Sequence, residues 1–128
     1  ALRFPDKQVF SIVGDGGALM TGSELATAVA HKAKIRVIVA NNNHYGTIRY
    51  HQEVHFPTRD HYATKLVNPD FAKYGESFGL KCFTIHNTEE ILPTIKSAMK
   101  VDGPSLIEFK MSLELNTSTT TISQLQTN

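Results

Sequence analysis

Two short polar motifs in this sequence carry the residue types that bind a metal ion and a phosphate group. The first is Gly14-Asp15-Gly16, and the second is Asn41-Asn42, which follows after the length of one helix plus one strand. Mg²⁺ prefers hard oxygen ligands and is commonly held by one or two protein carboxylates or amides, with phosphate oxygens and water completing its shell. One aspartate and one asparagine therefore suit a magnesium-phosphate site.

The glycines beside Asp15 suit the phosphate part of such a site. A backbone without Cβ lets phosphate oxygens approach, and the N–H groups at a helix N-terminus carry partial positive charge. Gly16, Gly17 and Ala18 are placed for this role. The simplest alternative, a two-residue hairpin turn at Asp15-Gly16, would need an alternating strand afterwards, but residues 18–32 have a helical pattern.

Both motifs directly follow segments with the composition of buried strands. Short β-branched and aromatic runs are typical of strands, and a nearly continuous apolar run is typical of a strand buried on both faces of a parallel sheet. Four strands are predicted on these grounds, at residues 8–13, 35–40, 81–86 and 104–111. Because a crossover helix brings the carboxyl ends of its two strands to one edge of the sheet, Asp15 and Asn42 should face one point.

Helices are predicted between the strands. Their approximate bounds are residues 22–32, 45–52, 69–79 and 88–101, with a tight turn at 14–17 before the first and a loop around Pro57 after the second. For the third helix, Asn68 is the expected N-cap, Pro69 the first helical residue and Gly79 the C-terminus, while Phe71, Tyr74 and Phe78 form its core face. Strands that alternate with helices predict an α/β fold with an open, mostly parallel sheet and helices on both faces.

The composition favours one globular, cytoplasmic domain. The 128 residues are 41% hydrophobic and carry a net charge of +1, which gives no basic footprint for nucleic acid. The apolar runs are far too short to span a membrane, and the single cysteine, Cys82, is expected to be buried filler in a reducing compartment. We expect a domain over residues 1–115 and a polar tail over 116–128. Because the chain begins with a helix-like Ala1–Phe4 and not with Met, we expect a truncated domain from a longer protein.

Two weaker signals have ordinary explanations. His51 and His55 are spaced to share a helix face and could bind zinc, but Glu53 does not directly follow the first histidine as the zinc-protease pattern requires. The basic residues Lys32, Lys34 and Arg36 are expected to form a solvated turn between a helix and a strand.

At their spacing, the two motifs resemble the signature of thiamine diphosphate enzymes of the acetolactate synthase, pyruvate decarboxylase and benzoylformate decarboxylase group. Further residues similar to that group are Met20, Gly22, Glu24-Leu25-Ala26-Thr27, Tyr45-Gly46-Thr47-Ile48-Arg49 and Pro104-Ser105-Leu106-Ile107-Glu108. The resemblance covers nearly the whole chain. It implies the C-terminal, diphosphate-binding domain of such an enzyme, with thiamine diphosphate and Mg²⁺ as cofactors.

Carried over residue by residue, the resemblance implies that Asp15, the Asn42 side chain and the backbone carbonyl of His44 bind the metal. Gly16, Gly17 and Gly46 would line the diphosphate through main-chain groups. The full set of cofactor-binding residues expected is Gly14, Asp15, Gly16, Gly17, Ala18, Asn42, His44, Tyr45, Gly46 and Thr47. The helix that starts at Tyr45 would pass near the reactive end of the cofactor, which makes Thr47, Ile48, His51 and Gln52 candidates for contact with cofactor or substrate.

The resemblance also implies what the parent enzyme does. It would decarboxylate or carboligate a 2-oxo acid as a homo-oligomer. The glutamate that activates the cofactor belongs to a pyrimidine-binding domain of the same or a partner subunit, so this chain alone should be inactive. Acetolactate synthases typically have Met in place of Thr47 and Trp in place of His51, so the product is left open.

Two rival functions stay open. The chain could be a cofactor-binding or assembly module without catalytic activity. It could also be a flavodoxin-like regulatory domain with Asp15 as a phospho-acceptor, although Asn42 stands where a further acid would be expected. Neither a G-x-G-x-x-G dinucleotide motif nor a P-loop G-K-[ST] is present, which disfavours NAD and nucleoside triphosphates.

Overall fold

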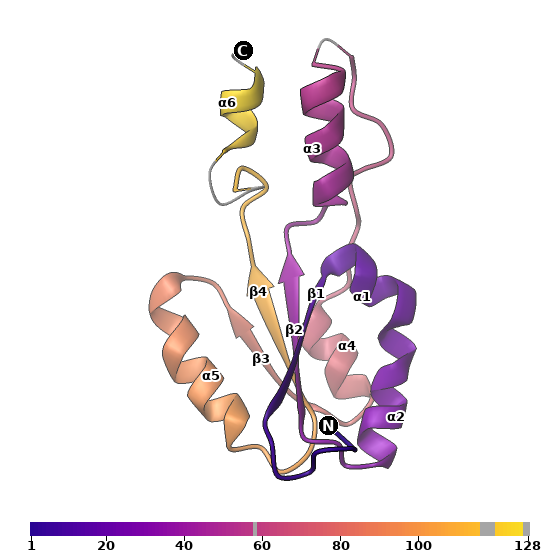
Figure 1. The fold of residues 1–128 in the computed structure, drawn as a ribbon, viewed down its shortest axis with the longest axis vertical. Coiled ribbons are helices and arrows are strands. Elements are labelled where there is room, and N and C mark those ends of the chain that lie inside the picture. The colour runs from indigo at the N-terminus through magenta and orange to yellow at the C-terminus, as the bar shows by residue number, and fades with distance from the viewer. Residues whose placement is uncertain (58, 116–119, 127–128) are drawn as a thin grey trace.

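A four-stranded, all-parallel sheet forms the centre of the chain, with the strand order β1-β2-β4-β3 (Figure 1). This computed structural model describes residues 1–57, 59–115 and 120–126. The strands are β1 (Val9–Gly14), β2 (Ile35–Asn41), β3 (Lys81–Ile85) and β4 (Ser105–Lys110). The predicted α/β fold with an open parallel sheet is confirmed.

Helices cover both faces of this sheet, as predicted. They are α1 (Asp15–Thr21), the short 3₁₀ helix η1 (Gly22–Glu24), α2 (Leu25–Ala30), α3 (Gly46–His55), α4 (Phe71–Ser77), η2 (Thr88–Glu90), α5 (Ile91–Met99) and α6 (Ile122–Gln126). In Figure 1, α1, α2 and α4 lie on one face and α5 lies on the other. Beyond the carboxyl ends of the strands, α3 and α6 lie side by side and contact each other.

Each face of the sheet has its own apolar cluster. Leu106 packs with Phe71 of α4 on one face, and its neighbour Ile107 packs with Ala98 of α5 on the other. All four side chains are fully or almost fully buried. Because successive residues of a strand point to opposite faces, β4 serves both clusters and is the best buried strand. The predicted core face of α4 is confirmed, since Tyr74 and Phe78 pack against the first cluster.

The predicted start of the first helix is wrong. The chain enters α1 directly at Asp15, without a separate tight turn, and bends at η1 before it continues as α2. Gly14 is extended, with φ −71° and ψ 158°, so the strand ends at the residue that precedes the helix. The helical pattern that we recognised from residue 18 onwards therefore begins three residues earlier, because glycines 16 and 17 are part of the helix.

The predicted N-cap of α4 is also wrong. Asp70, not Asn68, caps this helix, and its Oδ1 accepts a hydrogen bond of 3.0 Å from the backbone N–H of Lys73. That hydrogen bond lowers the pKa of Asp70. At the other end, Gly79 has φ +89°, a left-handed conformation that glycine adopts without strain, which agrees with its predicted place at the C-terminus.

The prediction of a solvated basic cluster is wrong for Arg36. This side chain is fully buried near the amino ends of the strands, whereas Lys32 and Lys34 are exposed. Its guanidinium donates hydrogen bonds to Gln8 Oε1 and to three backbone carbonyls at and beyond the C-terminus of α5, those of Met99, Val101 and Gly103. Burial lowers the pKa of Arg36.

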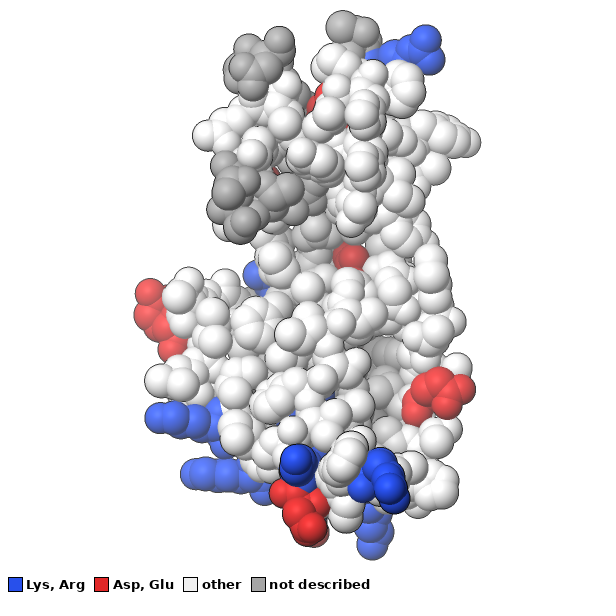
Figure 2. All heavy atoms as spheres, in the orientation of Figure 1, with Lys and Arg blue, Asp and Glu red and all other residues white. Residues whose placement is uncertain are grey.

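Figure 2 shows that most of the visible Lys and Arg side chains lie at the amino ends of the strands, away from α3. In the described part of the chain, no helix has the length and apolar character needed to cross a bilayer. The predicted tail contains α6, whose Ile122 is buried, while residues 116–119 and 127–128 lie outside the described residues.

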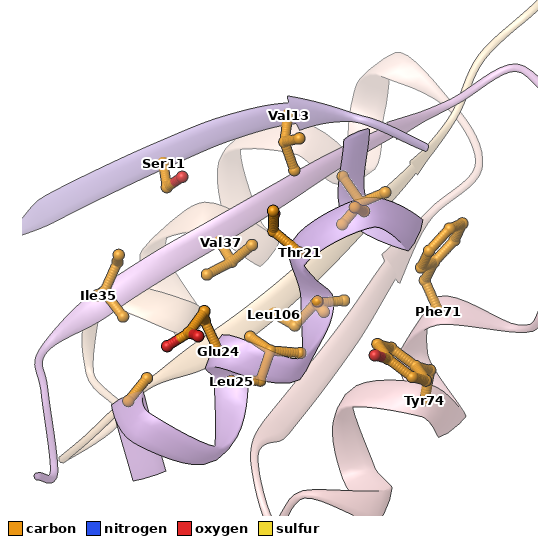
Figure 3. Close-up of a pocket in the computed structure, with 14 residues that line it drawn as sticks. Ser11, Val13, Thr21, Glu24, Leu25, Ile35, Val37, Phe71, Tyr74 and Leu106 are labelled. Atoms are coloured by element: carbon orange, nitrogen blue, oxygen red, sulfur yellow. The ribbon is translucent and has the colours of Figure 1, made fainter. Parts of the chain in front are cut away.

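An apolar hollow lies between α1, α2, α4 and the sheet (Figure 3). It is lined mainly by aliphatic and aromatic side chains, among them Val13, Val37, Phe71 and Leu106. The hydroxyls of Ser11 and Thr21 and the carboxylate of Glu24 are its side-chain polar groups apart from Tyr74. We assign no ligand to it, because few polar groups converge there.

Candidate functional site

A second hollow opens at the carboxyl ends of β1 and β2, and it contains most of the residues predicted to hold a diphosphate. Its lining comes from two segments, the β1–α1 junction and the start of α3. The lining residues are Gly14, Gly16, Gly17, Tyr45, Gly46, Thr47 and Ile48. Parallel pairing of β1 with β2 causes this meeting, since Gly14 lies opposite Ala40 and the segments after both strands begin at one edge.

The close approach of these two segments requires glycine at position 16. A Cβ added there would lie 2.6 Å from Cδ1 of the Tyr45 ring, which is closer than real Cβ contacts allow. Gly14 differs, because an added Cβ would meet nothing within 4 Å. The wall of the hollow at Gly16 is thus bare backbone packed against an aromatic ring.

Asp15 lies between two of the lining glycines in the sequence, and it is almost completely buried, with 2% of the residue exposed. Oδ1 accepts a hydrogen bond of 2.9 Å from the N–H of Gly16. Oδ2 accepts one of 2.7 Å from the side-chain amide of Asn68, which comes from the segment before α4. Each carboxylate oxygen can accept more than one bond, so both keep a lone pair for a cation.

The asparagine-rich turn after β2 is built from two successive side-chain turns. Asn41 Oδ1 accepts from the N–H of Asn43 at 3.1 Å, and Asn42 Oδ1 accepts from the N–H of His44 at 3.0 Å. Asn43 has φ +58°, a left-handed conformation that asparagine tolerates better than most residues. This arrangement explains why three consecutive asparagines fit here.

The residue of this turn that is linked to Asp15 is Asn41 and not Asn42, and the link runs through Asn68. Asn68 donates to Asp15 and also to Asn41 Oδ1, at 2.9 Å. Asn41 in turn donates to the buried carboxylate of Glu108 on β4 at 2.6 Å, and Lys110 donates to the same oxygen at 2.6 Å. A chain of buried and partly buried polar side chains therefore runs from the end of β1 across the carboxyl edge to β4.

A segment that we call the strap, residues 61–68, forms backbone hydrogen bonds with the asparagine-rich turn and the residue after it. The N–H of Tyr45 donates to the carbonyl of Thr64 at 2.8 Å, and the N–H of Leu66 donates to the carbonyl of Asn43 at 2.8 Å. At its start, His61 lies 3.0 Å from the buried carboxylate of Glu53 on α3. The strap is thus attached to the asparagine-rich turn by two backbone hydrogen bonds, and its first residue lies close to α3.

Not every predicted residue joins this arrangement. Ala18 is buried in the apolar cluster, so its side chain is part of the core. Asn42 uses its amide oxygen in the turn to His44, and no direct contact with Asp15 is recorded, so a shared ion stays a prediction. His51 and His55 stack with ring centroids 5.7 Å apart. Within residues 1–57, 59–115 and 120–126, no group of three or more His, Cys, Asp and Glu side chains is placed to hold a metal.

Sequence reasoning missed three residues of the polar network, Asn68, Glu108 and Lys110. Asn68 was interpreted as a helix cap, since Asn before Pro is typical of a helix start. Glu108 lies within a predicted strand, and a carboxylate in an otherwise buried strand is the signal that could have identified it.

The residues present fit a magnesium diphosphate group. The donor set consists of hard oxygens, a carboxylate and amides, which are the ligands that Mg²⁺ prefers. The adjoining hollow has a glycine wall where a side chain at position 16 would collide with Tyr45. Backbone groups exposed in this way can approach phosphate oxygens closely.

Comparison with known proteins identifies related domains. Residues 1–109 match the family model described as thiamine pyrophosphate enzyme, C-terminal TPP binding domain. The chain is 37% identical over 118 residues to 3D-(3,5/4)-trihydroxycyclohexane-1,2-dione hydrolase of Bacillus subtilis (strain 168), covering 86% of this chain and 18% of that protein. It is 31% identical over 109 residues to the acetolactate synthase large subunit of Porphyra purpurea, covering 84% and 18%.

A solved structure gives the same result. The thiamine diphosphate-dependent 4-hydroxybenzoylformate decarboxylase of Rhodococcus jostii RHA1 superposes with a TM-score of 0.80 at 29% sequence identity, covering 87% of this chain and 21% of that one. The chain therefore spans about a fifth of the length of these relatives.

Proposed function

The chain belongs to the thiamine pyrophosphate enzymes, whose C-terminal TPP-binding domain it carries, and from this membership we propose that it anchors the cofactor's diphosphate through Mg²⁺. Asp15, the side chain of Asn42 and the backbone carbonyl of His44 would hold the metal. The single observation that carries the proposal is the meeting of the β1–α1 glycines with the start of α3 around one hollow, with the buried Asp15 between two of these glycines in the sequence.

In this proposal each part of the site has its own task. Gly16, Gly17 and Gly46 present backbone to the phosphates, and Asp15 supplies negative charge to the metal. The other proposed cofactor-binding residues of the β1–α1 junction and the start of α3 would surround the diphosphate. They are Gly14, Ala18, Tyr45 and Thr47. Thiamine diphosphate supplies the electron-sink chemistry when it is bound, and the residues of this chain bind and orient it.

We propose that the parent protein decarboxylates or carboligates a 2-oxo acid, together with a pyrimidine-binding domain of the same or a partner subunit in a homo-oligomer. The names of the relatives support only this broad class, because they include a hydrolase, a synthase and a decarboxylase. Their shared property is the cofactor. The isolated chain should bind Mg²⁺ and diphosphate weakly and show no turnover.

A titration of thiamine diphosphate into the chain, with and without Mg²⁺, tests the anchor. We expect Mg²⁺ to tighten binding in the wild type, and Asp15→Ala to remove that metal-dependent part. Isothermal calorimetry measures both. An identical titration of the two proteins would contradict the assignment, and 2-oxo acid decarboxylation by the isolated chain would contradict its expected inactivity.

A further inference from the structure

We propose that Asn68 is a positioning residue of the diphosphate site, which fixes the Asp15 carboxylate relative to the asparagine-rich turn and so sets the metal selectivity. This inference rests on the proposed function, because it assigns a task to a residue that supports the anchor. It arises from a contact between segments that are far apart in the chain and that no motif links.

Both hydrogens of the Asn68 amide nitrogen are used within the site. One hydrogen bond goes to Asp15 Oδ2 at 2.7 Å and the other to Asn41 Oδ1 at 2.9 Å. A single planar amide group therefore joins the residue after β1 to the last residue of β2. Bonds to a carboxylate are among the stronger hydrogen bonds in proteins, so this link restricts the carboxylate more than a neutral pair would.

The far end of the network determines which way the amide groups face. Glu108 can only accept, so Asn41 must turn its NH₂ group toward Glu108, at 2.6 Å. The Asn41 oxygen then faces Asn68, which must in turn present its NH₂ group to two acceptors, Asn41 Oδ1 and Asp15 Oδ2. The buried carboxylate on β4 thereby orients the amide that contacts Asp15.

One atom of Asn68 is left over. Its Oδ1 is buried and has no hydrogen-bond partner among the described residues. A buried acceptor without a donor is unfavourable, and most such atoms in folded proteins are paired. This oxygen belongs to the same amide group that donates to Asp15, so the site keeps one polar atom that a bound ligand could satisfy.

The strap explains how Asn68 reaches this place. The bond from Leu66 N–H to the Asn43 carbonyl brings the chain to the asparagine-rich turn two residues before Asn68. The cap of α4 is supplied by Asp70, so Asn68 is not needed for that task. The residue that caps α4, Asp70, and the residue that links Asp15 to Asn41, Asn68, are therefore different, and each can be tested by its own substitution.

The experiment compares Asn68→Ala with Asp70→Ala in the full chain. Mn²⁺ binding in the presence of thiamine diphosphate is followed by the EPR signal of free Mn²⁺, and Mg²⁺ and Ca²⁺ are measured by competition. Mg²⁺ needs near-ideal octahedral geometry while Ca²⁺ tolerates irregular sites, so a loosened carboxylate should lose Mg²⁺ affinity first. We expect Asn68→Ala to lower the Mg²⁺-to-Ca²⁺ affinity ratio about tenfold, and Asp70→Ala to lower only the melting temperature.

Each outcome has one meaning. Absence of metal-dependent binding in the wild type would overturn the proposed function itself. A wild type that binds and an Asn68→Ala protein with an unchanged ratio would overturn only the role of Asn68. If Asn68→Ala does not fold, Asn68→Gln decides, because it keeps the polar group but displaces it by one methylene: a lowered ratio supports the proposal and a wild-type ratio overturns it.

Discussion

The two ends of the sheet both bury a charged side chain, but they surround it differently. At the amino ends of the strands, the Arg36 guanidinium has four hydrogen bonds to neutral oxygens, three of them backbone carbonyls. At the carboxyl ends, the Asp15 carboxylate has two recorded donors, one from Gly16 and one from Asn68. Asp15 keeps acceptor capacity that its surroundings do not use.

We interpret this difference as one between a structural charge, Arg36, and the proposed metal-binding charge, Asp15. A buried charge is costly unless it is hydrogen-bonded, so a fully surrounded guanidinium joins β2 to the end of α5 and has little left for a ligand. A carboxylate beside a backbone-lined hollow can still take a cation. Burial alone does not distinguish them, since both residues are at most 2% exposed.

The largest expected effect on stability is at the amino ends of the strands, where Arg36 is buried. Arg36→Met keeps much of the apolar stem but leaves the carbonyls of Met99, Val101 and Gly103 without their donor. Unpaired buried acceptors cost about 1–3 kcal/mol each, and partial rehydration should limit the total loss of unfolding free energy to about 2–4 kcal/mol. Urea denaturation measures it. A loss below about 1 kcal/mol, or a weakened Mg²⁺ affinity at equal folded fraction, would contradict a purely structural role for Arg36.

The next effect concerns the glycine wall. Gly16→Ala forces the Tyr45 ring to move, and overpacking of this kind costs about 1–3 kcal/mol. We expect reduced stability together with weaker diphosphate binding, measured by denaturation and calorimetry. Gly14→Ala is the matched stability control, because its Cβ would meet nothing within 4 Å. Equal stability of the two variants would show that the contact at Gly16 is not tight.

A smaller effect on stability is expected at the binding end. Asp15→Asn removes the charge and keeps one oxygen, which can accept from Asn68, while the N–H of Gly16 loses its acceptor, so the unfolding free energy should fall by about 1 kcal/mol. Metal-dependent binding of thiamine diphosphate should nevertheless be lost. Thermal unfolding and calorimetry on the same sample measure both. A large destabilisation with binding intact would reverse the roles that we assign to the two ends.

The smallest effect concerns Cys82, which packs against the first apolar cluster but is only partly buried, so its predicted burial is confirmed only in part. Burial, with a contribution from Glu76, raises the pKa of this thiol from 9.0 to about 11. The thiol should therefore react slowly with iodoacetamide at pH 8.5 and faster as the pH approaches 11. Because the unfolded thiol ionises first, its contribution to stability is complete below pH 9 and is lost as pH rises toward 11. Equal alkylation rates in the folded and urea-unfolded chain would contradict this.

Much of the fold follows from the sequence alone. Strand composition and helical spacing predicted all four strands to within about one residue at each end, and the alternation of elements predicted the parallel sheet. The glycine and asparagine motifs were placed correctly at one sheet edge, because parallel strands joined by a crossover must end together. These features depend on local composition and on chain connectivity, and both are visible in a sequence.

Only the tertiary structure could assign Arg36, Asn68 and Glu108. A basic residue near a turn and an asparagine before a proline have ordinary local explanations, and both explanations were wrong. The partners of these side chains lie far away in the sequence. Asn68 contacts Asp15, 53 residues away, and the pairs Arg36 with Gly103 and Glu108 with Asn41 are each 67 residues apart. Local pattern determines which elements form, but the pairing of buried polar groups depends on which elements meet, and that is decided when the chain packs.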